Sequence, residues 1–132
     1  MVVDHPQPPD DVVQRLGAIC AQFPDAREHE AWTGTSWRRG DVTFAHVVEI
    51  TDGWPPAYAR AFGTGGPATV VTFQAAPDEY EALRAAGHPY HHPPWRPGIV
   101  GVVVDDTTDW TELAELVGDS YRECGGRRAR SE

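Results

Sequence analysis

IVGVVV, residues 99–104, is a continuous apolar run of strand length in which apolar and polar residues do not alternate. Such a run is typical of a strand that is buried on both faces. The next segment, DWTELAELVGDSYRE at 109–123, places apolar residues at helical spacing, and Glu112 follows Asp109 as in a capping box. We therefore expect a central strand at 99–104 covered by an amphipathic helix that begins near Asp109.

Period-two patterns upstream of this strand predict an antiparallel sheet. EHEAW (28–32), TSWRR (35–39) and VTFAHVVEI (42–50) are expected as strands, with a hairpin turn at Gly40-Asp41, and ATVVTFQA (68–75) is also strand-like. In the third strand, alternation predicts one face made of Val42, Phe44, His46, Val48 and Ile50. The many glycines and prolines of residues 52–67 predict an irregular connection.

Helical periodicity predicts two further helices. Apolar residues recur at intervals of three and four from Val12 to Phe23, and Pro77 and Gly87 bound a second short segment. The expected order is therefore α-β-β-β-β-α-β-α. We predict an α+β fold in which an antiparallel sheet of about five strands packs with three helices. One domain is expected at 10–124, between a flexible leader at 1–9 and a flexible tail at 125–132.

Charge and cysteine content restrict the classes of function. The 132 residues carry a formal net charge of −9, and all 11 basic side chains are arginine. A surface of this sign repels the phosphate backbone of a nucleic acid, so a DNA-binding role needs a local basic patch. Two cysteines without a ligand spacing and the lack of a long apolar run predict a cytoplasmic protein without a membrane span.

The stretch HPYHHPPWRPG at 88–98 concentrates three histidines with aromatic and proline residues. Its prolines favour an extended path that would place His88 and His91 on one side. Two imidazoles are fewer than the roughly four ligands of a structural zinc site. We predict no metal and no cofactor, and a metal-dependent enzyme using His88, His91 and His92 remains the alternative.

The carboxyl-terminal third resembles the YjbR/MmcQ family of bacterial proteins. The resemblance rests on HPYHHPPW, IVGVVVD and DWTELAELVGDSYRE, with Asp109-Trp110 at the helix start and Ser120-Tyr121-Arg122 near its end. It continues more weakly through residues 10 to 124. The resemblance implies a compact α+β fold similar to that of secretion chaperones, described as a double wing, together with a DNA-binding role and no catalytic residues. The absence of lysine departs from the family pattern.

Two binding hypotheses follow, and neither involves catalysis, because no spacing in the sequence enforces a catalytic constellation. In the first, DNA is the partner. Its candidate contacts are Trp37, Arg38, Arg39 and Arg96. In the second, a planar small molecule or a partner protein occupies an aromatic cleft. The candidate residues for that ligand are Trp54, Tyr90, His91, His92 and Trp95.

Overall fold

The computed structural model describes the backbone of residues 6–131 and the side chains of residues 6–125. The first five residues of the predicted leader and most side chains of the predicted tail lie outside this range. The elements are α1 (Asp10–Cys20), β1 (Ala26–Glu30), β2 (Thr35–Arg39), β3 (Val42–Ile50), α2 (Pro56–Phe62), β4 (Ala68–Gln74), α3 (Pro77–Ala86), β5 (Tyr90–His91), β6 (Ile99–Val104) and α4 (Trp110–Ser131).

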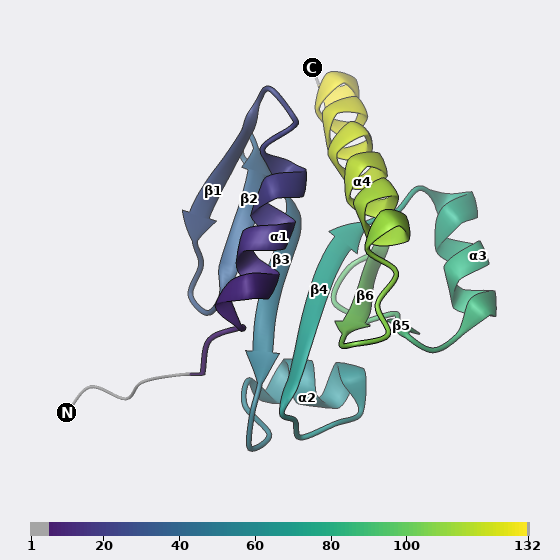
Figure 1. Ribbon diagram of the computed structural model, residues 1–132. Coiled ribbons are helices and arrows are strands. Elements are labelled where there is room, and N and C mark those ends of the chain that lie inside the picture. The colour runs from purple at the N-terminus through teal and green to yellow at the C-terminus, as the bar shows by residue number, and fades with distance from the viewer. Residues whose placement is uncertain (1–5, 132) are drawn as a thin grey trace.

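The strands form one antiparallel sheet with the order β1-β2-β3-β4-β6-β5 (Figure 1). Helices α1 and α4 lie side by side over one face of this sheet, α3 lies beyond the β6–β5 edge, and α2 lies at one end of the sheet. We call the sheet face opposite α1 and α4 the open face. No helix among the described residues has the length and apolar character needed to cross a membrane.

Two cores occupy the two faces of the sheet. Adjacent rows of paired valines point in opposite directions, as the period of two requires. The row that faces the main core, with α1 and α4, consists of Val47, Val71 and Val102. The row that faces a smaller core under α2 consists of Val48, Val70 and Val103. The apolar run at 99–104 is therefore covered on both faces, as its sequence predicts.

A β-bulge at Phe44 changes the face that the start of β3 presents. Trp37 pairs with Ala45 and Arg38 pairs with Thr43, so Phe44 is the additional residue. Phe44 and Ala45 both enter the main core, whereas His46 faces the other side. The prediction that Phe44 and His46 share one face is therefore wrong, because simple alternation does not continue through a bulge.

Ser120 of α4 bonds to the backbone of two central strands. Its hydroxyl donates to the Phe44 carbonyl oxygen at 2.7 Å and accepts from the Gln74 amide at 2.9 Å, and the residue is fully buried. The next residue, Tyr121, stacks on Phe23 at a ring distance of 4.6 Å. The Ser-Tyr pair in the middle of α4 thus attaches this helix to the bulge and to the segment that follows α1.

The predicted α+β class is correct, but the predicted element count is too low. The described residues form four helices and six strands in the order α-β-β-β-α-β-α-β-β-α. Helix α2 lies inside the segment 52–67 that was expected to be irregular, because prolines at its start and Gly63 at its end are compatible with a short helix. Strand β5 lies inside the stretch 88–98, where it pairs with β6.

An acidic contact joins α3 to α4. Burial and a hydrogen bond with Asp119 raise the pKa of Glu79 from 4.5 to about 7, and the charges of Asp119, Asp78 and Glu123 act in the same direction. The folded state therefore favours the protonated Glu79 carboxyl. Stability from this group is fully present below pH 4.5 and is lost as the pH rises toward 7.

Glu79→Gln is accordingly expected to raise the free energy of unfolding at pH 8 and to change it little at pH 4.5. Glutamine retains the shape of the protonated acid but cannot acquire its charge. Urea unfolding at the two pH values measures the difference. Glu81→Gln, at an exposed position of the same helix, should show no such gain; an equal gain in both variants would contradict the assignment to Glu79.

Candidate functional site

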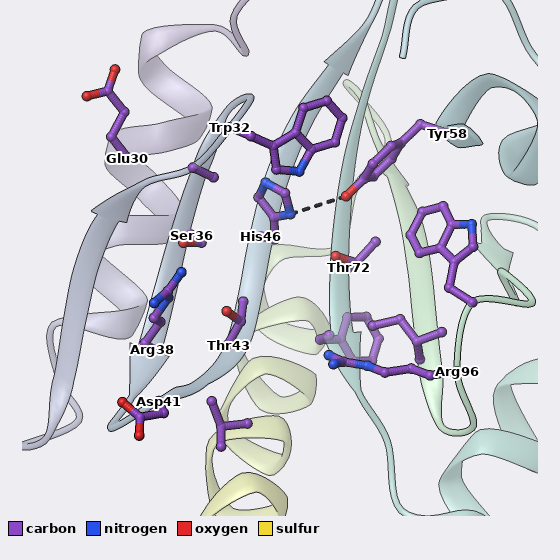
Figure 2. Close-up of a pocket in the computed structure, with 15 residues that line it drawn as sticks. Glu30, Trp32, Ser36, Arg38, Asp41, Thr43, His46, Tyr58, Thr72 and Arg96 are labelled. Atoms are coloured by element: carbon purple, nitrogen blue, oxygen red, sulfur yellow. Dashed lines mark hydrogen bonds between the residues drawn. The ribbon is translucent and has the colours of Figure 1, made fainter. Parts of the chain in front are cut away.

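A cleft lies on the open face, between the β1–β3 side of the sheet and the loop that precedes β6 (Figure 2). Its volume is about 700 Å³, within the range of about 300–1,000 Å³ that is usual for small-molecule sites. The side chains that line it and that are used below are Trp32, Ser36, Arg38, Thr43, His46, Tyr58, Thr72, Trp95 and Arg96, with Glu30 and Asp41.

Aromatic rings form one end of the cleft. Trp95 contacts Tyr58 at a ring distance of 4.7 Å, and Trp32 lies 6.3 Å from the same tyrosine ring. Trp32 is 68% exposed and Trp95 is 41% exposed, whereas Tyr58 is buried. Among the described residues these two tryptophans are the large hydrophobic side chains that remain exposed. Both therefore present uncovered ring surface at the same cleft.

Tyr58 is held in place by His46. The His46 Nε2 atom lies 2.8 Å from the Thr33 carbonyl oxygen, which can only accept, so this nitrogen carries the proton. The Tyr58 hydroxyl then donates to Nδ1 at 3.2 Å (Figure 2). Burial lowers the pKa of His46 and raises that of Tyr58 to about 12. His46 is therefore a neutral imidazole with both nitrogens bonded, and it joins the 31–34 loop to α2.

A row of paired residues crosses the sheet at the level of His46. Starting from β1, its members are His29, Ser36, His46, Thr72, Gly101 and His91. Gly101 leaves room for α2, because a Cβ there would lie 2.2 Å from the Phe62 ring. The rest of the row forms a polar floor on the open face. Arg38, two residues after Ser36, pairs with Arg27 on β1 and with Thr43 on β3.

The candidate DNA contacts are divided between the two faces of the sheet. Trp37 is 3% exposed and packs under α1 in the main core. Arg39 also faces the helices, where its guanidinium lies 4.2 Å from the Tyr121 ring and donates to the Tyr121 carbonyl oxygen. Arg38 and Arg96 line the cleft. Only the latter two therefore lie together on the open face.

The candidate ligand residues are also separated. Trp95 lines the cleft, and Trp54 contacts Trp32 at a ring distance of 5.9 Å. Tyr90 instead donates to Glu112 at 2.5 Å beside a separate cavity of about 250 Å³ next to α4. The aromatic cluster at the cleft consequently includes Trp95 but not Tyr90.

The three histidines of the 88–98 stretch point to different surroundings. The His91 ring lies 4.9 Å from the Phe62 ring. The His92 ring lies 4.6 Å from the Tyr80 ring, and its Nε2 atom lies 3.3 Å from the Tyr80 carbonyl oxygen. His88 lines the small cavity beside α4. Within the described part of the chain, no group of three or more histidine, cysteine or acidic side chains is placed to hold a metal ion.

Several cleft residues are not predicted by the sequence. They are Trp32, Ser36, Thr43, Tyr58 and Thr72. Alternation along β2 could have indicated Ser36, because it shares a face with Arg38 and not with Trp37. Tyr58 and Phe62 have a helical spacing of four, but the surrounding prolines and glycines obscure it. No sequence signal connects Trp32 with Trp95.

Comparisons with known proteins agree with this architecture. A crystal structure of a Pseudomonas syringae structural-genomics target has a TM-score of 0.51 and 18% identity, covering 76% of this chain and 78% of that chain. At this identity the likeness concerns the fold alone. No match was found among curated proteins. The sequence model of the YjbR family matches residues 21–123, which span β1 to α4 and most of the chain. The chain therefore belongs to the YjbR family.

Proposed function

We propose that this protein binds a planar small molecule in the cleft on the open face and acts by binding rather than by catalysis. The observation that carries the proposal is the pair of exposed tryptophans, Trp32 and Trp95, whose rings lie 6.3 Å and 4.7 Å from the Tyr58 ring. Exposed aromatic surface that borders a cleft is typical of a binding site. Indole rings provide flat faces on which a planar ligand can stack.

The chemistry of the cleft favours binding over catalysis. A general base needs a free nitrogen and a pKa near the working pH. His46, the imidazole that lines the cleft, has both nitrogens bonded and a lowered pKa. Ser36 lies beside His46 across the β2–β3 ladder, but the two bonds of His46 leave it no lone pair to activate the hydroxyl. The cleft residues therefore support recognition and not nucleophilic attack.

Trp95→Leu is expected to weaken binding of the neutral planar probe 2-naphthamide by about 5- to 140-fold, because loss of one stacking ring costs about 1–3 kcal/mol. Isothermal titration calorimetry measures the affinity. Trp110→Leu is the matched control, since Trp110 lies on the helix side against Arg15. Equal binding by both variants, or no binding by the unaltered protein, would rule out the proposed cleft. Native mass spectrometry of untagged protein identifies a retained ligand.

DNA is the second candidate ligand, favoured by the cross-strand pair of Arg27 and Arg38 on the open face. Two observations weaken it: the net charge is −9, and Trp37 and Arg39 face the helices. DNA binding should decrease steeply with added salt and with Arg38→Glu. Binding of a neutral planar probe should depend little on salt. Fluorescence titrations with duplex DNA at two salt concentrations distinguish the two ligands.

A further inference from the structure

We infer that the ligand of the open-face cleft carries one anionic group, a carboxylate or a phosphate, on its planar ring. This inference rests on the proposed function, and it concerns the polar end of the cleft. There the groups available to an anion are Arg38, Arg96 and the Ser36 hydroxyl.

Two buried polar atoms at this end lack a protein partner. Ser36 is 2% exposed, and neither its Oγ atom nor the Nε atom of Arg38 has a hydrogen-bond partner among the described residues. Buried donors without partners are uncommon in folded proteins, and each one requires an explanation. Since both residues line the cleft, a ligand oxygen bound beside either residue would supply the missing partner.

The guanidinium groups are arranged to receive such an oxygen. Figure 2 shows that Arg38 extends along β2 toward Ser36, while Arg96 reaches over the sheet from the opposite wall toward Thr43. Arginine binds carboxylate and phosphate oxygens through paired, charge-assisted hydrogen bonds. The anionic group of a ligand between these walls would therefore meet positive charge from both sides.

Charge repulsion at the edge of the cleft points to the same ligand. Arg27 and Arg38 are direct cross-strand partners, and like charges in that position destabilise a sheet. A bound anion would reduce this repulsion. The cleft also contains Glu30 and Asp41, but Figure 2 shows both carboxylates at the outer edge and pointing away from the centre. Their position disfavours an extended phosphate backbone and is compatible with one anionic group.

The test compares three probes that share one ring system: 2-naphthoate, 2-naphthyl phosphate and the neutral 2-naphthamide. At least one anion is expected to bind at least about tenfold more tightly than 2-naphthamide, because hydrogen bonds to charged groups are stronger than neutral ones. Which anion binds more tightly distinguishes a carboxylate from a phosphate ligand. Calorimetry provides the three affinities.

Two variants locate the anion site. Arg38→Gln should lower the ratio of anion affinity to 2-naphthamide affinity to about one, whereas Arg84→Gln, at an exposed position on α3, should leave this ratio as it is in the unaltered protein. Ser36→Ala should weaken anion binding without lowering stability, because it removes a hydroxyl that has no partner. A residue with a purely structural role would show the reverse: lower stability and unchanged affinity.

The outcomes separate this inference from the proposed function. If 2-naphthamide binds as tightly as both anions, or if Arg38→Gln retains the anion preference, the inference is wrong and the planar-ligand proposal stands. If none of the three probes binds, the proposed function fails and the inference fails with it.

Discussion

Gly34→Ala is expected to lower the free energy of unfolding by about 3–5 kcal/mol, the largest effect expected of any single substitution considered for this protein. Gly34 has a φ of +70°, and a Cβ built there would lie 1.9 Å from the Val47 carbonyl oxygen. Backbone atoms cannot move aside as a flexible side chain can. The substitution would therefore displace the 31–34 loop from β3, and with it the Thr33 carbonyl that binds His46.

Gly63→Ala separates the two causes of this loss, which are the strain of a left-handed backbone and the clash with Val47. Gly63 also has a left-handed backbone, with a φ of +65°, but a Cβ added there would have no atom within 4 Å. Its substitution should cost only the conformational strain, about 1–2 kcal/mol. Urea unfolding of both variants, followed by circular dichroism, gives the two losses. Similar values would show that the clash of the added Cβ with Val47 does not contribute to the loss in Gly34→Ala.

Ser120→Ala is expected to lower the free energy of unfolding by about 2–5 kcal/mol, because it leaves two buried backbone groups without their side-chain partner. The affected groups are the Phe44 carbonyl at the bulge and the Gln74 amide on β4. Chemical denaturation measures the loss. Because the bulge sets the face that His46 presents, the variant should also weaken probe binding in the cleft.

The control for Ser120→Ala is Thr111→Ala at an exposed position near the start of the same helix. It removes a hydroxyl of comparable size without touching the sheet, so its effect should stay within about 0.5 kcal/mol. If both variants lose the same small amount, the two hydrogen bonds of Ser120 make no net contribution.

Local chemistry explains which elements were predictable. The hairpin turn at Gly40, the helix bounded by Pro77 and Gly87, and the Asp109 cap, which accepts from the Glu112 amide at 3.1 Å, all depend on neighbouring residues. Helix α2 and strand β5 were not predicted, for a different reason. Their few residues are stabilised by contacts with a distant strand. Phe62 of α2 packs over Gly101 of β6, and β5 pairs with β6.

The predicted DNA contacts Trp37, Arg38 and Arg39 do not share one face of the sheet. Neighbouring residues in a strand point to opposite faces, so period two alone separates Arg38 from the other two. The structure places Arg38 on the open face and its neighbours on the helix side. Arg38 is therefore next to Trp37 in the sequence but on the opposite face of the sheet.

By itself the sequence determined the α+β class, the buried strand at 99–104 and most helix and strand boundaries, because these depend on local periodicity and on turn and cap residues. The resemblance of its motifs also indicated the family. The cleft was decided only by the tertiary structure. Trp32, Ser36, Tyr58 and Trp95 come from four separate segments and meet through strand pairing, the bulge at Phe44 and the packing of α2. Spacing along the chain carries no information about such meetings, since each depends on register and packing across the whole sheet.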